Sequence, residues 1–255
     1  MELRIWHLYP KDMNIYGDRG NVIALLRRAR WRGIEAVVRS ADVGESIDAD
    51  AVDLIFAGGG QDDQQVAVSR DLQGRKGEIL RRLAEDDVPM LLVCGTYQLF
   101  GHYFRTGRGD ELKGIGLLDL YTVAGTRRLI GDALVEAEVD LPEGSPGTLV
   151  GFENHSGQTF LGPGCRRLGR VVVGGGNNGR DGGEGAAHRW VHGTYLHGPV
   201  LPKNPWLTDR LILQALRRRG WREPLPPLDD REELAAHRAI AERTRRGGRR
   251  KTGVV

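Results

Sequence analysis

Short apolar runs alternate with helix-like stretches along the first 104 residues, and this alternation constrains the fold more than any other feature. The pattern predicts strands at residues 3–8, 34–39, 53–57 and 90–93, and helices at residues 19–32, 77–86 and 97–104. Asp18 is a candidate N-cap for the first helix, and Gly33 ends that helix. Residues 54–57 and 90–93, in the two later strands, are apolar without interruption, which is typical of strands buried on both faces of a parallel sheet. We therefore predict an α/β fold, with a largely parallel central sheet and helices on both faces.

The pattern changes after residue 113, where strand-like pieces are shorter and are separated by glycine and proline. These pieces lie at residues 117–123, 133–139, 149–152 and 168–173. They predict an antiparallel or mixed edge on the same domain, followed by a loop at residues 174–185, a strand at 190–196 and a helix at 204–219. We expect residues 1–222 to form one domain. Residues 223–255 are expected to form a proline-rich linker and a polar helix with a basic C-terminal tail.

The positive charge of the chain is concentrated at its C-terminal end. The net charge is +3, but seven basic residues and one acid lie between Arg238 and Val255. Residues 1–237 therefore carry a net charge of −3, which argues against a nucleic-acid-binding core. The tail is left to dock an acidic partner or to lie near an anionic membrane. Two cysteines are too few for a disulfide framework, and no apolar run reaches the roughly 20 residues of a membrane helix, so we expect a cytoplasmic protein.

The strand at residues 90–93 leads directly into Cys94, Gly95 and Thr96, and a helix follows. This order is that of a nucleophile elbow, in which a tight strand-to-helix turn exposes a reactive side chain. A helix N-terminus lowers the pKa of a thiol and offers amide N–H groups to a developing oxyanion. A buried structural cysteine is the better interpretation of an isolated cysteine. The small residues after Cys94 and the glycine loop one strand earlier favour the nucleophile.

That glycine loop is Gly58-Gly59-Gly60, at the end of the strand predicted over residues 53–57. Consecutive glycines allow backbone N–H groups to approach a ligand closely, so the loop is a candidate second half of an oxyanion hole. A simple left-handed turn is the alternative. Residues 174–179 fit the pattern G-x-G-x-x-G, but no helix pattern follows them, and we interpret them as a loop.

A cysteine nucleophile needs a base, and histidine is the usual one. His197 directly follows the strand at residues 190–196, which places it at an end of the sheet. His192 lies an odd number of residues away and is expected on the opposite face. His155 lies in another predicted loop and is the second candidate.

The three motifs at residues 58–60, 94–98 and 193–198 together resemble the cobyric-acid-synthase-type branch of class I (triad) glutamine amidotransferases. Within this family, residues 8–21, 151–157, 176–179 and 196–204 are most similar to the glutaminase subunits of lipid II isoglutaminyl synthases. The resemblance implies a class I amidotransferase domain that hydrolyses glutamine through a cysteine thioester. Ammonia would pass to a Mur-ligase-like subunit in a heterodimer, which amidates D-glutamate of lipid II during peptidoglycan synthesis at the inner face of the membrane. No cofactor is expected in this chain, whereas ATP and Mg²⁺ are expected in the partner.

The resemblance also implies roles for single residues. Cys94 would be the nucleophile and His197 the general base and acid, with backbone N–H groups of Gly60 and Gly95 in the oxyanion hole. Arg128 would bind the α-carboxylate of glutamine, which suits a bidentate guanidinium. An exposed strand arginine is the alternative for Arg128 and for its neighbour Arg127, and Gln98 is a weaker candidate for substrate contact. A corrinoid amidotransferase component and a catalytically silent binding module remain alternative functions.

One position departs from the family pattern. Triad amidotransferases usually carry an acid two residues after the histidine, where this chain has Pro199. We therefore expect the acid that orients His197 to come from elsewhere, with the partner subunit as one source.

Overall fold

The computed structural model describes residues 2–252. Its elements in chain order are β1 (Glu2–Leu8), α1 (Arg19–Trp31), β2 (Glu35–Ala41), a 3-10 turn (Ala49–Ala51), β3 (Leu54–Ala57), α2 (Asp62–Leu72), α3 (Arg75–Glu85), β4 (Met90–Val93), α4 (Gly95–Leu99), β5 (Tyr103–Arg105), β6 (Glu111–Lys113), β7 (Leu120–Ala137), β8 (Thr148–Leu161), β9 (Gly169–Val173), β10 (Gly183–Glu184), β11 (Ala186–His188), β12 (Val191–Thr194), α5 (Val200–Lys203), α6 (Pro205–Arg218) and α7 (Arg231–Thr252).

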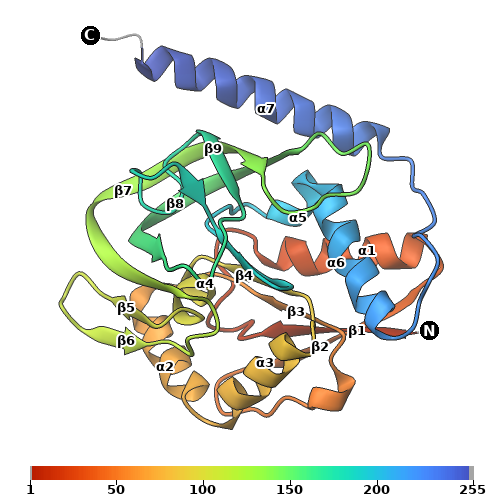
Figure 1. Cartoon of the computed structure of the whole chain (residues 1–255), viewed down its shortest axis with the longest axis horizontal. Helices are drawn as coiled ribbons and strands as arrows, with labels where there is room; N and C mark the ends of the chain where they lie inside the picture. The colour runs from red at the N-terminus through yellow and green to blue at the C-terminus, as the bar shows by residue number, and fades with distance from the viewer. Residues whose placement is uncertain (1, 253–255) are drawn as a thin grey trace.

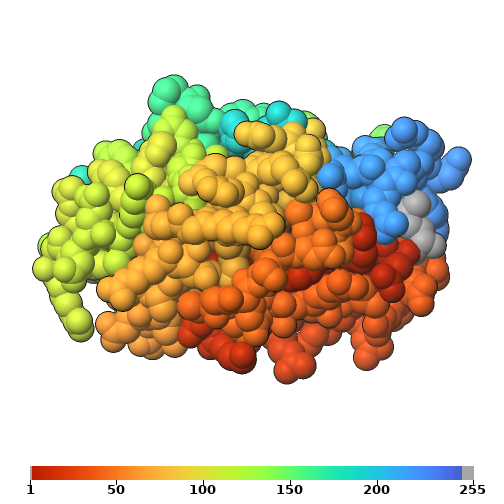
Figure 2. Space-filling model, turned by 90° about the horizontal axis from the view of Figure 1, so that it is seen from below, coloured from red at the N-terminus to blue at the C-terminus, as the bar shows by residue number. Residues whose placement is uncertain are grey.

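The first sheet confirms the predicted parallel core. Its strand order is β11-β12-β4-β3-β1-β2, and every pair is parallel except β11 with β12. β3 and β4 are buried along their whole length. α1 and α6 lie on one side of this sheet and α2 and α3 on the other (Figure 1). Figure 2, seen from below, shows α2 and α3 in orange and gold covering that second side. The carboxyl ends of β3, β4 and β12 thus meet at one edge, as in other open parallel sheets.

Most of the antiparallel strands form a second sheet instead of extending the edge of the first. This sheet has the order β10-β9-β7-β5-β6, and β8 pairs with β7. Three of the four predicted short pieces are parts of two long strands, β7 and β8, which pair as a hairpin, and the fourth, at residues 168–173, is β9. Their register shifts between Ala124 and Leu129. Irregularities of this kind bend a strand and redirect side chains, and this one contains Arg127 and Arg128.

Two predictions within residues 60–105 are wrong. α2 was not expected, because its buried positions include the polar residues Gln65 and Ser69, which weaken the apolar period. The helix predicted at residues 97–104 ends at Leu99, and residues 103–105 form β5. The chain turns sharply at Gly101, where an added Cβ would lie 2.2 Å from Leu120 Cδ1.

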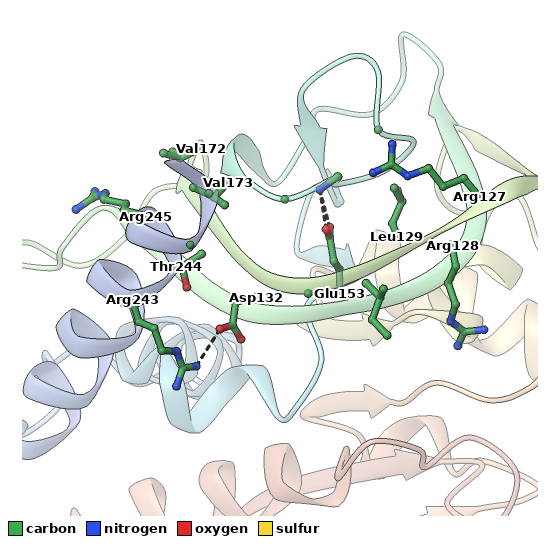
Figure 3. A pocket seen from close by; sticks show the side chains of 17 residues that line it. Arg127, Arg128, Leu129, Asp132, Glu153, Val172, Val173, Arg243, Thr244 and Arg245 are labelled. Atoms are coloured by element: carbon green, nitrogen blue, oxygen red, sulfur yellow. Dashed lines mark hydrogen bonds and ion pairs between the residues drawn. The ribbon is translucent and has the colours of Figure 1, made fainter. Parts of the chain in front are cut away.

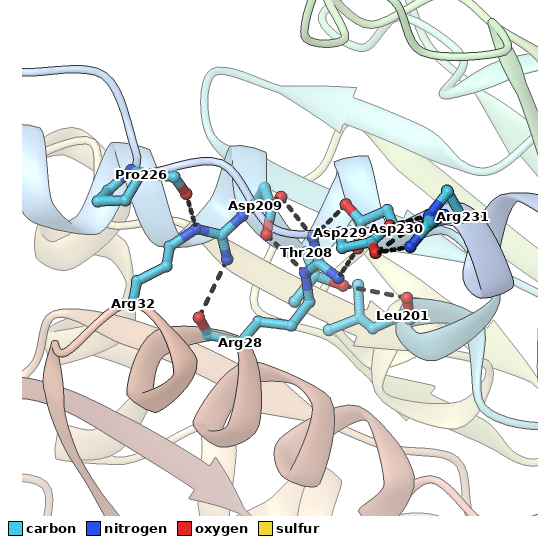
Figure 4. Close-up of polar contacts among 9 residues, drawn as sticks. All are labelled: Arg28, Arg32, Leu201, Thr208, Asp209, Pro226, Asp229, Asp230 and Arg231. Atoms are coloured by element: carbon cyan, nitrogen blue, oxygen red, sulfur yellow. Dashed lines mark hydrogen bonds and ion pairs between the residues drawn. The ribbon is translucent and has the colours of Figure 1, made fainter.

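The start of the C-terminal segment is tied to the body by a cluster of ion pairs and hydrogen bonds. Arg28 of α1 is buried and binds two carboxylates, those of Asp209 on α6 and Asp230 just before α7 (Figure 4). Arg32 reaches Asp209 and the carbonyl of Pro226 in the linker. This cluster holds the linker against α1 and α6.

α7 lies along the second sheet and is not a free tail in its described part (Figure 1). Ala241 and Ile240 pack on Leu134 and Val150, and the buried His237 contacts Thr148 Oγ1 at 2.9 Å. The basic tail was predicted from Arg238 onwards, but the helix packs at least as far as Gly248, whose Cβ would lie 3.0 Å from Val173. The end of the predicted tail, residues 253–255, lies outside the described residues. Within residues 2–252, no helix has the length and apolar character needed to span a bilayer.

Candidate active site

Cys94 occupies a strained turn between β4 and α4, which confirms the predicted elbow geometry. Its backbone has φ +53° and ψ −106°, a left-handed region that residues other than glycine rarely occupy. Its side chain is 7% exposed. The Thr96 hydroxyl lies 2.9 Å from the carbonyl oxygens of both Ala57 and Gly58. The elbow is thereby fastened to the glycine loop at the end of the neighbouring strand.

The three glycines at residues 58–60 do not form a left-handed turn, because none of them has a positive φ. They are explained instead by neighbouring atoms that leave no room for a Cβ. A Cβ on Gly58 would lie 2.5 Å from Met13 O, and one on Gly60 would lie 2.4 Å from Met13 Sδ. A Cβ on Gly95 would lie 3.1 Å from the backbone nitrogen of Gly60. The backbone of the predicted oxyanion hole is therefore assembled where glycine alone fits.

Gly59 is the point on which Cys94 and His197 converge. A Cβ on Gly59 would lie 3.1 Å from Cys94 Cβ and 3.1 Å from His197 Cε1. His197 lies just past β12, where it exchanges two backbone hydrogen bonds with Phe152 of β8, and its side chain is fully buried. Burial opposes protonation of the imidazole, but the negative charges of Cys94 and Asp18 outweigh it and raise the pKa of His197 to about 10. The structure thus brings together the predicted nucleophile and the predicted base.

Two further residues, Asp18 and Tyr16, lie at this site without any local sequence signal that predicts it. Asp18 Oδ1 lies 3.8 Å from His197 Nδ1, and both side chains are fully buried. The Tyr16 ring packs edge-on against the imidazole, with the ring centroids 5.0 Å apart. Pro199 instead packs on the start of α1, since a Cβ on Gly20 would lie 2.4 Å from Pro199 Cγ.

Arg128 and Gln98 lie on two other sides of the site. Arg128 donates to Asn154 Oδ1 at 2.6 Å and to the hydroxyl of Tyr16 at 3.3 Å, which links it to the residue that covers His197. Gln98 is buried, and its amide nitrogen donates to the hydroxyl of Tyr195 at 3.0 Å. The Gln98 Oε1 atom is buried and has no hydrogen-bond partner within the described chain.

The second candidate base, His155, and the other cysteine, Cys165, both lie in surroundings that suit a structural role. His155 stacks on Tyr195 with centroids 3.5 Å apart, its Nδ1 lies 2.7 Å from the carbonyl of Gly157, and burial lowers its pKa to about 4. The Cys165 sulfur accepts from the backbone of Asp119, and burial raises the pKa of its thiol to about 11. A protonated thiol is a poor nucleophile, so Cys165 is unsuited to catalysis.

His192 is buried in β12, where its Nε2 accepts from Arg210 at 3.2 Å. Burial, reinforced by the charge of Arg210, lowers the pKa of His192 to about 3. Below pH 6.5 the unfolded chain therefore binds a proton that the folded chain does not. We predict that this histidine lowers the free energy of unfolding by about 1.4 kcal/mol per pH unit as the pH falls from 6.5 towards 3. Urea unfolding at several pH values should show a shallower slope for His192→Gln, and an unchanged slope would contradict the prediction.

A groove of about 1030 Å³ begins beside Arg128 and runs under the C-terminal half of α7 (Figure 3). Arg127 also lines it, whereas Arg128 is the arginine that donates to Tyr16 beside His197. On the floor, Glu153 accepts from the backbone N–H groups of Gly175 and Gly176. The backbone N–H groups of the G-x-G-x-x-G segment thus bind a carboxylate of the chain itself. This agrees with the interpretation of residues 174–179 as a loop.

The chain is similar to known glutamine amidotransferases in sequence and in fold. The chain matches the CobB/CobQ-like glutamine amidotransferase domain over residues 4–205. It is 40% identical over 245 residues to the lipid II isoglutaminyl synthase (glutamine-hydrolyzing) subunit GatD of Staphylococcus aureus N315, covering 96% of this chain and 97% of that protein. The Streptococcus pneumoniae R6 protein of the same name is 38% identical, over 90% of this chain and 86% of that protein. A crystal structure of a glutamine amidotransferase from Thermotoga maritima superposes on this chain with a TM-score of 0.53 at 14% sequence identity. The superposition covers 97% of this chain and 92% of the Thermotoga chain, which shows a shared fold.

Proposed function

Because the chain belongs to the CobB/CobQ-like glutamine amidotransferase family, we propose that it is the glutaminase subunit of a lipid II isoglutaminyl synthase. The convergence of Cys94 and His197 on Gly59 is the observation that carries the glutaminase part of the proposal. The lipid II part rests on relatives that match nearly the whole chain, beyond the residues of the family domain itself.

In the proposed reaction, the Cys94 thiolate attacks the side-chain carbonyl carbon of glutamine. The backbone N–H groups of Gly60 and Gly95 stabilise the resulting oxyanion; Gly95 is the first residue of α4, so its N–H has no partner inside that helix. The protonated His197 donates its proton to the leaving nitrogen, and the C–N bond breaks to release ammonia. A thioester between Cys94 and the glutamyl group remains.

Water then attacks the thioester while His197 accepts a proton from it. The C–S bond breaks, glutamate leaves, and the Cys94 thiolate and the His197 imidazolium are restored. The high pKa of His197 supports this scheme, because an ion pair with the thiolate is the resting state that the first step requires.

Arg128 is proposed to bind the α-carboxylate of glutamine. Asn154 and Tyr16 engage two of its nitrogens from one side, which leaves N–H groups at the end of the fork for a carboxylate. We predict that Arg128→Ala raises KM for glutamine roughly 10- to 100-fold, the equivalent of about 1.5–3 kcal/mol for a charged hydrogen bond. Arg127→Ala is the matched control and should change KM less than threefold. Equal effects of the two substitutions on KM would contradict this assignment.

The ammonia acceptor is proposed to be bound by a Mur-ligase-like partner, which would also hold ATP and Mg²⁺ and form a heterodimer with this chain in the cytoplasm. The basic C-terminal end is proposed to contribute to docking this partner or to contact with an anionic membrane. The decisive experiment is to purify the chain with its partner and supply glutamine labelled with ¹⁵N in its side-chain amide. Transfer of the label to the D-glutamate α-carboxyl of lipid II supports the proposal. Glutamate release with transfer to a corrinoid acid, or no glutamate release, would overturn it.

A further inference from the structure

We infer that Asp18 is the positioning residue of His197 and replaces within this chain the acid that triad amidotransferases carry two residues after the histidine. This inference rests on the proposed function, because it assigns a residue to the same glutaminase site. Its basis is the pair of unpartnered polar atoms that face each other at the start of α1.

The geometry places a carboxylate opposite Nδ1 of the His197 imidazole. Asp18 Oδ1 and His197 Nδ1 are 3.8 Å apart, and neither atom has a hydrogen-bond partner within the described chain. The separation is longer than a hydrogen bond, but such bonds at catalytic sites are often long before substrate binds. A shift of about 1 Å would close it.

The position of Asp18 argues against an ordinary structural role. It precedes α1 as the N-cap, yet its side chain makes no capping bond, and the first N–H of the helix donates instead to Asn14 Oδ1 at 2.9 Å. The carboxylate is fully buried, and in the described chain it receives one hydrogen bond, from Gly59 N–H to Oδ2 at 2.7 Å. A buried carboxylate is costly unless a cation or further donors pair with it. A protonated His197 supplies that pairing.

The same contact couples the imidazole to the glycine loop. Because Gly59 N–H is directed at Asp18, it is not available to the oxyanion, and the orientation of the next peptide follows from this bond. One carboxylate therefore holds the general base with one oxygen and the loop of the proposed oxyanion hole with the other. A carboxylate from a partner subunit would have to displace Asp18 to reach the fully buried Nδ1.

Several other ionisable groups surround His197. The Cys94 thiol faces it across Gly59, Tyr16 covers the ring edge, and His155 stacks behind Tyr195. The Lys203 ammonium donates a hydrogen bond to the carbonyl oxygen of His197 at 3.5 Å. Asp18 is the carboxylate within ion-pair distance of the ring among residues 2–252.

The test is Asp18→Asn, measured in the complex with the partner subunit and in the isolated chain. Asparagine keeps an oxygen for Gly59 N–H but removes the charge. We expect kcat for glutamine hydrolysis to fall at least about 100-fold while KM changes less than threefold. The alkaline limb of the kcat/KM profile should move to lower pH, because His197 then loses its proton more easily. Asn14→Ala is the control, since it removes the hydrogen bond at the start of α1 and leaves Asp18 in place. Its kcat should stay within threefold of the wild type.

A kcat for Asp18→Asn within threefold of the wild type, or an unmoved alkaline limb, would overturn the inference. If Asp18→Asn does not fold, His197 is titrated by NMR in the folded Cys94→Ala variant. A His197 pKa above the ordinary 6.5 supports pairing with Asp18, and a value below 6.5, as burial alone would produce, overturns it. Wild-type complex that releases no glutamate from glutamine would refute the proposed function itself, whereas the NMR titration does not depend on activity.

Discussion

Cys94→Ala should abolish glutamine hydrolysis, with kcat reduced roughly 10⁴-fold or more, because no other nucleophile in the described part of the chain is placed to form the thioester. Cys165 cannot replace it, since burial raises the pKa of that thiol to about 11 and its sulfur is engaged by the backbone of Asp119. Release of glutamate from glutamine is the measurement. The matched control is Cys165→Ala, which should retain full activity.

Cys94→Ala should abolish amidation of the acceptor only when glutamine is the nitrogen donor. With ammonium salts in its place, a complex containing Cys94→Ala should still amidate the acceptor, because the synthetase step consumes only ammonia. A glutamine-analogue electrophile should label Cys94 in the wild-type chain and leave Cys165 unmodified. Hydrolysis that survives in Cys94→Ala would disprove the cysteine mechanism and favour a silent binding module.

The backbone conformation of Cys94 is expected to lower the stability of the fold. A residue other than glycine at φ +53° carries strain of about 1–3 kcal/mol. The hydrogen bonds of Thr96 to the glycine loop and of Cys94 N–H to Thr194 hold the turn in place. Such strain is expected at the proposed nucleophile, because a tight turn between strand and helix is what presents its side chain to a substrate.

The parallel core and the elbow could be predicted from sequence because their signals are local. β3 and β4 are short, uninterrupted apolar strands, and the residues that follow each of them are small. A few consecutive residues therefore specify both the burial of the strand and the turn after it. His197 could be selected for the same reason, since it comes just after β12.

The rest of the site depends on contacts between residues far apart in the chain. Asp18 was predicted correctly as the residue before α1, but nothing near it in sequence indicates that its carboxylate turns towards Gly59 and His197 instead of capping the helix. Only the family resemblance, and no local pattern, singled out Arg128 over Arg127, because the register shift of β7 against β8 decides which of the two reaches Tyr16. A shift of register depends on both strands of a hairpin and leaves no periodic signal in either.

Arg28→Leu should lower the free energy of unfolding by about 3–5 kcal/mol, which is the usual effect of removing one partner from a buried ion pair. The Arg28 side chain is 4% exposed and donates four hydrogen bonds, two to Asp209 and two to Asp230. Their charges and hydrogen bonds raise the pKa of Arg28 further, against the effect of burial. Leucine would leave Asp230 without its cation, whereas Asp209 keeps Arg32.

The measurement is thermal or urea unfolding, with a fall in Tm of roughly 6–20 °C for a chain of this size. The neighbouring Arg27 is exposed on the same helix, and Arg27→Ala should change stability by less than about 0.5 kcal/mol. Adding Asp230→Asn to Arg28→Leu should recover part of the loss, because the uncompensated carboxylate is then removed. Since α1 carries Asp18 at its other end, glutaminase activity at low temperature should remain near that of the wild type as long as the helix stays folded. Equal destabilisation by Arg27→Ala and Arg28→Leu would show that the two-carboxylate cluster does not hold the C-terminal segment to the core.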